Sequence, residues 1–356
     1  MVDLHQTVHS ATQASMEVVR NTIEIALENA VWMLHTKGTL ASAIDIPYSI
    51  NTDCARTALT SNRTTTVWKT LESGCMISYT QTMYCLASSL SLYADVFRAA
   101  FGINGRVNMD SFLRCMVSKW TMTTVYESFV LSKTAENMTW HVDGGTLNKS
   151  DLVIYIVMGP HDAISCFMLL AIDHHALVSA QCNNAKFPSD DEITMSVGQL
   201  DDISLAMKAP DINGCTATLQ GLCNFRELNG LKVTVKEYIK DNNYRITLRS
   251  TGKDKKVHVK YLVLAPQYCP LPNEIREAAT KRPILAQAIE MNVLRCYCIW
   301  GRTGQVVIFD GSKLHGVYNF ESHSGIPQIA IAVNYRGIVP HIMKTRNRKR
   351  VKLTYR

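Results

Sequence analysis

The sequence HVD at residues 141–143, followed far along the chain by VVIFDGSKLH at 306–315, decides the fold that we expect. Alternate residues of a strand project to the same side, so His141 and Asp143 can bind one metal ion from one strand. His315 comes shortly after a strongly β-forming run and can supply a third ligand from a second strand. Two imidazoles and a carboxylate on one face of a ferrous ion leave its other coordination positions open. We therefore predict a metal site at His141, Asp143 and His315.

Segments with the composition of strands surround both motifs. β-branched and aromatic residues in period-two alternation are typical of strands, and apolar residues at helical spacing are typical of helices. The predicted strands are 123–130, 151–158, 163–172, 232–240, 244–249, 256–264, 293–300, 306–309 and 328–336. The predicted helices are 8–36, with Ser10 as its N-cap and Gly38 as its stop, then 76–103, 108–120 and 272–291.

At these residues the chain resembles the iron(II)/2-oxoglutarate dioxygenases. The segment GRTGQVVIFDGSKLHGV, from Gly301, is similar to the strand–turn–histidine segment of that family. The segment AIAVNYR, which ends at Arg336, is similar to the strand that ends its metal site. The resemblance covers about residues 124–180 and 294–340, which is under a third of the chain. It implies an α+β fold with a double-stranded β-helix (jelly-roll) core, braced by N-terminal helices and carrying a large insertion between core strands.

The resemblance also implies an enzyme that uses Fe(II) and the cosubstrate 2-oxoglutarate to hydroxylate or oxidise a C–H or methyl group. Its iron ligands would be His141, Asp143 and His315. The distal carboxylate of the cosubstrate needs a buried cation, because an unpaired buried carboxylate is unfavourable. The chain departs from the family at this point, since no Lys or Arg lies between Gly316 and Tyr335.

Three residues are therefore candidates for binding the cosubstrate. Arg336 ends the last predicted strand, and Gln328 stands near the position where the family often has its Arg. These two share strand parity, and would point to the same face of a regular strand. Lys149 follows the H-x-D pair, and some relatives use a Lys on the next strand.

The long separation of Asp143 from His315 points to one branch of the family. The TET/JBP-like branch, which oxidises thymine or 5-methylcytosine in DNA, tolerates very large insertions here, so a nucleic-acid base is a candidate substrate. The tail 344–356 holds seven Lys and Arg and no acid, and residues 232–260 hold nine against three acids. Basic regions attract phosphate backbones, so we expect DNA or RNA as a partner. The tail can also act as a nuclear-import signal, which favours an intracellular location that includes the nucleus.

The composition is that of a folded globular protein, with 47% hydrophobic and 19% charged residues. No run reaches the ~18–20 apolar residues that span a bilayer, and the N-terminus does not resemble a secretion signal, so we expect no membrane partner. The 11 Cys are scattered without a C-x-x-C pair and are expected as reduced core residues. The expected divisions are a helical layer at 1–120, an oxygenase core at 121–340 with an insertion at about 182–290, and a basic tail at 341–356.

Two other functions stay open from the sequence. A protein or small-molecule hydroxylase could use the same fold and the same ligands. A non-enzymatic nucleic-acid-binding protein, or a viral structural protein, could use jelly-roll strands and a basic tail without a metal. The geometry of the site distinguishes them, because an oxygenase needs three ligand side chains that converge on one point.

Overall fold

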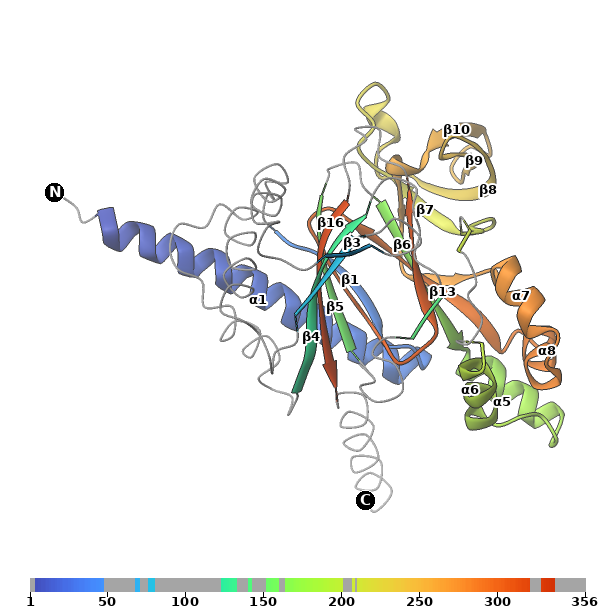
Figure 1. Cartoon of the computed structure of the whole chain (residues 1–356). Coiled ribbons are helices and arrows are strands. Elements are labelled where there is room, and N and C mark those ends of the chain that lie inside the picture. The colour runs from blue at the N-terminus through green and yellow to red at the C-terminus, as the bar shows by residue number, and fades with distance from the viewer. Residues whose placement is uncertain are drawn as a thin grey trace, which may run out of the picture.

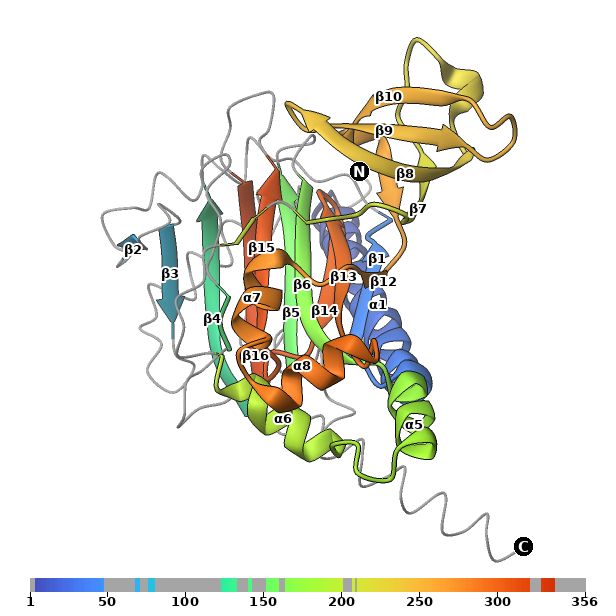
Figure 2. The ribbon, with the colours of Figure 1, turned by 90° about the vertical axis from the view of Figure 1, so that its right-hand side faces the viewer.

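The computed structural model describes residues 4–47, 68–70, 76–80, 123–132, 140–142, 152–159, 164–200, 207–208, 210–320 and 328–336. Two antiparallel sheets form the centre of this part of the chain, and a third sheet lies beyond one end of them (Figures 1 and 2). A long N-terminal helix and several short helices surround the sheets, so the class is α+β.

The larger central sheet has seven strands in the order β1-β14-β5-β16-β4-β3-β2. Its strands are β1 (Ala41–Asp45), β14 (Gln305–Phe309), β5 (Leu152–Gly159), β16 (Gln328–Arg336), β4 (Thr123–Ser132), β3 (Met76–Thr80) and β2 (Trp68–Thr70). The smaller sheet has four strands in the order β12-β13-β6-β15. They are β12 (Gln267–Cys269), β13 (Leu294–Arg302), β6 (Ile164–Ile172) and β15 (His315–Phe320).

The path of the chain through these two sheets is that of a double-stranded β-helix. From β4 the chain reaches His141, which pairs with His315 at the edge of the small sheet, and then enters β5 in the large sheet and β6 in the small one. After a long insertion it continues through β13 in the small sheet, β14 in the large, β15 in the small and β16 in the large. The predicted jelly-roll core is therefore confirmed. Strands β4, β5, β6, β13, β14 and β16 lie where the sequence placed strands, whereas β15 was not predicted.

The two central sheets enclose an apolar core. Because side chains alternate across a strand, every second residue of β5, β6, β13 and β14 points inward. Phe167 connects the sheets, with its ring centre 4.8 Å from that of Tyr155 and 5.6 Å from that of Phe309. The inner core consists mainly of Val153, Tyr155, Val157, Phe167, Leu169, Ala171, Tyr297, Ile299, Val307, Phe309 and Val317.

Helix α1 (Leu4–Lys37) packs against β1 and β14 of the large sheet (Figure 1). Its apolar stripe is buried as predicted, at Val19, Ile23, Ala26, Leu27, Ala30 and Leu34. Gly38 ends the helix with a φ of 77°, and its N–H donates to the Leu34 carbonyl at 3.1 Å. The predicted stop is confirmed, but Ser10 lies inside the helix, which begins earlier, at Leu4.

The N-terminal region contains strands that the sequence did not predict. Residues 76–80 were expected to begin a helix but form β3, which pairs with β4. The segment MISYT mixes apolar and β-forming residues, and so short a run does not distinguish a strand from a helix by periodicity. The neighbouring strand decides the outcome, by offering backbone hydrogen bonds. The helix predicted at 108–120 lies outside the described residues.

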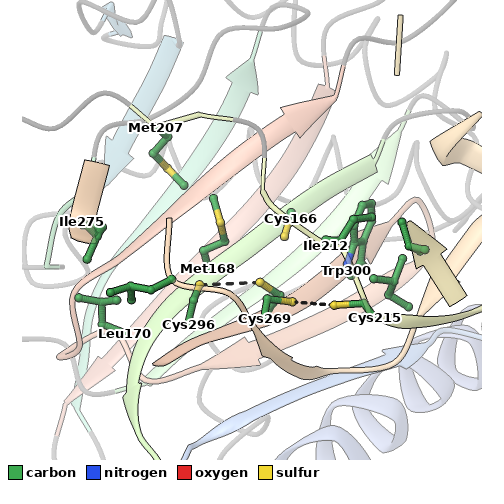
Figure 3. Packing of buried hydrophobic residues seen from close by; sticks show 14 of the residues in the cluster. Cys166, Met168, Leu170, Met207, Ile212, Cys215, Cys269, Ile275, Cys296 and Trp300 are labelled. Carbon is green, nitrogen blue, oxygen red and sulfur yellow. Dashed lines mark hydrogen bonds between the residues drawn. The ribbon is translucent and has the colours of Figure 1, made fainter. Parts of the chain in front are cut away.

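The chain between β6 and β13 forms the insertion. It contains α5 (His174–Asn183), α6 (Asp190–Gly198), α7 (Asn273–Ala279), α8 (Pro283–Glu290), and short 3-10 helices at Arg226–Leu228 and Val259–Tyr261. Its own five-stranded sheet has the order β10-β9-β8-β7-β11. These strands are β10 (Asp254–His258), β9 (Asn243–Leu248), β8 (Lys232–Lys240), β7 (Thr216–Leu219) and β11 (Leu262–Leu264). The apolar side of the insertion packs on the outer face of the small sheet (Figure 3).

Two predicted elements of the insertion are interrupted. The helix expected at 272–291 is two helices, because Pro283 lacks an N–H and holds Arg282 in an extended conformation, with φ −116° and ψ 118°. The strand expected at 256–264 is divided between β10 and β11 by a 3-10 turn. No helix in the described part of the chain has the length and apolar composition of a membrane span.

Candidate metal centre

Two of the three predicted metal ligands meet at one end of the barrel. The His141 N–H donates to the His315 carbonyl at 2.8 Å, and the His315 N–H donates to the His141 carbonyl at 2.9 Å. Their ring centres are 4.5 Å apart, and the ring planes are tilted by 55°. Backbone pairing thus holds side by side two imidazoles that are far apart in the sequence.

The separation of the two rings fits two ligands of one metal ion. An imidazole nitrogen binds a divalent metal at about 2.1 Å, which puts the ring centre roughly 3 Å from the ion. Two imidazoles bound at right angles then have centres about 4.5 Å apart. The observed ring separation of 4.5 Å therefore suits adjacent positions of an octahedral ion.

The turn before β15 orients His315. The ring Nδ1 lies 2.8 Å from the Lys313 carbonyl oxygen, which can only accept, so Nδ1 carries the proton and Nε2 the lone pair. Asp310 closes this turn, because its Oδ1 accepts from the Ser312 N–H at 2.9 Å and from the Ser312 hydroxyl at 2.6 Å. A carbonyl that holds the second nitrogen is the usual support of a metal-binding histidine.

A buried carboxylate of the insertion holds the segment that carries His141. The indole N–H of Trp140, which is 2% exposed, donates to Glu274 Oε1 at 3.4 Å. The same oxygen accepts the Lys208 N–H at 3.3 Å. Glu274 belongs to α7, so the insertion positions the residue next to a predicted ligand. The sequence analysis missed this contact, because no local pattern connects Trp140 with Glu274.

The third predicted metal ligand and one predicted cosubstrate residue are not among the described residues. Asp143 and Lys149 lie outside the described residues, so their roles stay predictions. Within the described ranges, no three His, Cys, Asp or Glu side chains form a metal-binding group. The described part of the site therefore supplies an imidazole pair, and Asp143 stays the predicted carboxylate ligand.

The strand register places Gln328 and Arg336 at opposite ends of the barrel. At one end of β16, Tyr335 pairs with Leu152, and at the other end Ile329 pairs with Gly159. The Tyr335 end is the histidine end, since Val153 beside Leu152 pairs with Phe309. The Phe309 ring in turn lies 5.0 Å from that of His315.

This arrangement changes the interpretation of the two cosubstrate candidates. β16 has 9 residues, which at about 3.3 Å each extend roughly 30 Å. That length far exceeds a five-carbon dicarboxylate, so one cosubstrate cannot contact both Gln328 and Arg336. The register also shifts at Ile329/Ala330 and at Asn334/Tyr335. Both shifts skip a residue of the partner strand, Val125 of β4 and Met158 of β5, so they leave the predicted common face of Gln328 and Arg336 untested.

A cavity of about 280 Å³ lies near the ends of β6, α1 and α6, and neither His141 nor His315 lines it. Val142 and Leu314, the chain neighbours of the two histidines, line it together with Lys313, Asp310, His174 and Asp190. Among the lining residues that the structure describes, Lys313 is the single Lys or Arg. Lys313 was not among the residues predicted from the sequence, although its position two residues before His315 is a local signal.

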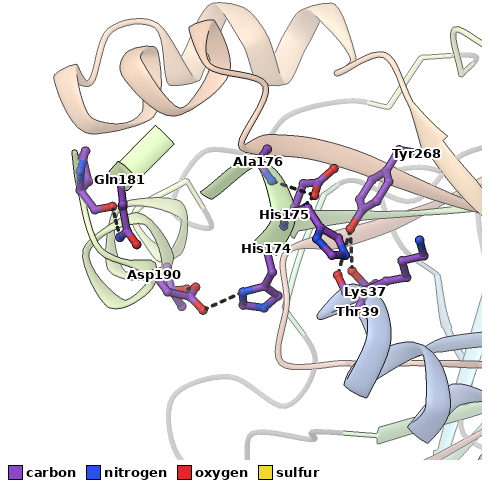
Figure 4. Close-up of polar contacts among 11 residues, drawn as sticks. Lys37, Thr39, His174, His175, Ala176, Gln181, Asp190 and Tyr268 are labelled. Atoms are coloured by element: carbon purple, nitrogen blue, oxygen red, sulfur yellow. Dashed lines mark hydrogen bonds and ion pairs between the residues drawn. The ribbon is translucent and has the colours of Figure 1, made fainter. Parts of the chain in front are cut away.

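The wall of this cavity is built where α1, α5 and α6 meet (Figure 4). Asp173 caps α5 by accepting the N–H groups of His175 and Ala176 at 3.1 and 3.2 Å. His174 then faces Asp190 of α6, with 3.9 Å between Nδ1 and Oδ2. Its ring also lies against Gly38, where a Cβ would be 1.6 Å from His174 Cδ2, so a side chain at position 38 is excluded.

The basic sheet of the insertion lies at the opposite end of the barrel from this cavity. β6 runs into α5 at the cavity end, whereas β8, β9 and β10 lie beyond the other end of the central sheets (Figures 1 and 2). The alternation predicted for these strands is confirmed on β9 and on the first half of β8, where Val233, Val235, Tyr244 and Ile246 are buried, whereas residues 236–240 of β8 are all exposed.

Fold and site together define a double-stranded β-helix protein with a histidine pair at one barrel end. Comparison with models of protein families and with curated proteins found no match. Among solved structures, the non-heme alpha ketoglutarate dependent carbocyclase SnoK from nogalamycin biosynthesis is similar, at 8% identity and TM-score 0.38, over 88% of this chain and 85% of that one.

Two further structures show a comparable likeness. A Pseudomonas putida prolyl-4-hydroxylase has 10% identity and TM-score 0.32, over 87% of this chain and 99% of that chain. HygX from Streptomyces hygroscopicus, crystallised with nickel, 2-oxoglutarate and hygromycin B, has 9% identity and TM-score 0.31, over 86% of each chain. At such values the likeness concerns the fold alone, and the assignment of the fold rests on the strand order.

Proposed function

We propose that this protein is an Fe(II)- and 2-oxoglutarate-dependent dioxygenase whose iron is held by His141, Asp143 and His315. One observation carries the proposal, which is the paired backbone and 4.5 Å ring separation of His141 and His315. A ferrous ion with 2-oxoglutarate and dioxygen supplies the oxidant for a C–H or methyl group. The chain itself would orient the ligands and shield them from water. The Lys313 carbonyl fixes the His315 tautomer, and the apolar inner core excludes water from behind the site.

The cosubstrate needs a cation at the histidine end of the barrel. Arg336 qualifies by its register on β16, and Lys313 qualifies because it stands two residues before His315. Gln328, at the far end, is unsuited to the same molecule. Replacing the cation that binds the distal carboxylate by Ala should raise the KM for 2-oxoglutarate more than about tenfold, since a charge-assisted hydrogen bond is worth roughly 1.5–3 kcal/mol. The variant, Arg336→Ala or Lys313→Ala, that shows the larger rise in the KM for 2-oxoglutarate identifies the residue that binds the distal carboxylate.

The metal site is tested by binding and by turnover. Co(II), a spectroscopic substitute for Fe(II), is titrated into the full chain and into His141→Ala, Asp143→Ala and His315→Ala. Each variant should bind it more than about 100-fold more weakly, because even supporting residues outside the ligand set change affinity by 10–100-fold. Succinate formation from 2-oxoglutarate with Fe(II) should be lost in parallel.

His175→Ala is the matched control, because His175 is an exposed histidine on α5. It should leave both readouts unchanged. Co(II) binding that survives loss of His141 and His315 would exclude the proposed site. Intact metal binding without any 2-oxoglutarate turnover would instead keep the site and reject the oxygenase.

A nucleic-acid base, as in the TET/JBP-like branch, is the substrate that we propose for this site. Its support is the charge of the chain, with seven basic residues in 344–356 and nine against three acids in 232–260. Because the sheet of β8 to β10 lies away from the histidine end, a polynucleotide held there must extend along the barrel. Removal of 344–356 should weaken DNA or RNA binding and flatten its dependence on salt, which gel-shift titrations at two salt concentrations measure.

A protein or small-molecule hydroxylase is the second candidate, and the cavity of about 280 Å³ lined by Val142 and Leu314, the chain neighbours of the two histidines, is the nearest place for a small substrate. That volume lies near the lower limit of sites for small ligands, roughly 300 Å³. Under this alternative, turnover of 2-oxoglutarate is stimulated by small compounds and not by DNA or RNA. A non-enzymatic nucleic-acid-binding or viral structural protein, in contrast, would bind polynucleotide equally well after His141→Ala and His315→Ala.

A further inference from the structure

Two buried thiols from distant parts of the chain meet at the junction of the insertion and the barrel. Cys215 directly precedes β7 of the insertion sheet, and Cys269 ends β12 of the small sheet. Their sulfur atoms are 3.5 Å apart (Figure 3). Backbone bonds hold Cys215 in place, since its carbonyl accepts the Val235 N–H at 2.9 Å. A disulfide needs an S–S distance of about 2.05 Å, so a small movement of two side chains would close the bond.

Both thiols line one cavity, of about 440 Å³, together with Arg276 and Arg295. Arg295 is held there by Asp173, with 3.2 Å between Nη1 and Oδ2, and by the ring of Tyr268, 4.6 Å from its guanidinium carbon. The cavity thus brings a dithiol and positive charge together. Neither the metal centre nor its neighbouring cavity includes any of these side chains.

We propose that Cys215 and Cys269 form a peroxide-reactive dithiol that closes to an intrachain disulfide at this cavity. Cys269 is the attacking sulfur. The hydrogen bond from the Cys215 thiol, followed by that from Cys298, lowers the pKa of Cys269, and the charge of Arg295 acts in the same direction. The hydrogen bond to Cys269 and burial raise the pKa of Cys215, which therefore stays a thiol and acts second.

The chemistry balances with hydrogen peroxide as the oxidant. The Cys269 thiolate attacks one peroxide oxygen, an S–O bond forms, the O–O bond breaks, and the departing hydroxide takes up the proton that Cys269 had released. The Cys215 sulfur then attacks the Cys269 sulfur, the S–O bond breaks, and the hydroxide leaves with the Cys215 proton. Two thiols and one peroxide become one disulfide and two waters, and each sulfur loses one electron.

The other buried thiols are poorly suited to the same reaction. Cys296 and Cys298 are 3.8 Å apart at sulfur but stand two residues apart on one strand. Their Cα atoms are then separated by roughly 6.6 Å, near the upper limit of about 6.8 Å for a disulfide. Cys166 is fully buried, and burial raises the pKa of its thiol. Cys215 and Cys269 therefore differ from the other buried thiols in two ways: they line a cavity, and their sulfur atoms meet from separate parts of the chain.

The test uses the full chain with Cys223→Ser, because Cys215 and Cys223 share the tryptic peptide 209–226. The protein is treated with about one equivalent of hydrogen peroxide, alkylated with N-ethylmaleimide, and digested without reductant. Mass spectrometry should find 209–226 joined to 261–276, the tryptic peptide of Cys269, with the loss of two free thiols per chain and full reversal by dithiothreitol.

Single variants assign the roles of the two sulfurs. Cys215→Ser should leave Cys269 as a sulfenic acid that dimedone captures, and Cys269→Ser should abolish both the disulfide and the capture. Cys182→Ser, at an exposed thiol, is the control and should change nothing. Circular dichroism confirms that each variant is folded.

Three results would overturn the proposal. The cross-link could be absent from folded protein, Cys269 could be joined to Cys298 instead of Cys215, or Cys182 could oxidise as readily as Cys269.

Discussion

The two faces of the small sheet carry different chemistry on the same strands. On β6 and β13 the inward set is Phe167, Leu169, Tyr297 and Ile299, and the outward set is Cys166, Met168, Cys296, Cys298 and Trp300. Alternation along each strand is enough to separate the two sets. The inner face is closed by the large sheet and leads to the histidine pair, whereas the outer face is closed by the insertion. One sheet can therefore carry the predicted metal ligands on one face and a thiol-rich interface with the insertion on the other.

The largest expected effect is on the inner face. Phe167→Ala should destabilise the protein by about 3–5 kcal/mol, because it leaves a cavity between the sheets. Urea unfolding followed by circular dichroism measures the change. Val178→Ala on α5, at a side chain that is 59% exposed, is the control and should have little effect. A loss below about 1 kcal/mol for Phe167→Ala would mean that the inner core can collapse around the missing ring.

A smaller effect is expected where the insertion touches the metal site. Trp140→Phe removes the indole donor of the buried Glu274 carboxylate and should reduce stability by about 1–3 kcal/mol. Co(II) affinity should fall as well, since Trp140 precedes His141. Trp32→Phe, at the exposed Trp of α1, is the matched control. Unchanged Co(II) affinity in Trp140→Phe would show that α7 does not position the ligand.

The smallest effect is expected on the outer face. Cys298→Ala removes one fully buried sulfur and should lower stability by about 1 kcal/mol. Co(II) affinity should stay at the level of the unmodified protein, because this side chain points away from the histidine pair. If the affinity falls as far as it does in Trp140→Phe, the two faces are coupled through the sheet and the comparison fails.

Prediction succeeded where the signal is local. The runs around Val153, Phe167 and Val307 alternate or are continuously apolar, so the barrel strands could be placed from the sequence. It failed at 76–80, where a short apolar segment becomes a strand only because β4 lies beside it. The alternation of β8 and β9 identifies an exposed face, but it carries no information about which end of the barrel that face occupies.

From the amino-acid order alone followed most of the jelly-roll strands and the buried stripe of α1. These depend on side-chain alternation and backbone propensity, which act between near neighbours. The Trp140–Glu274 contact, the separation of Gln328 from Arg336 and the meeting of Cys215 with Cys269 were decided by the fold. Each depends on how the insertion and the last strand return to the barrel, because long-range packing and strand register set those distances.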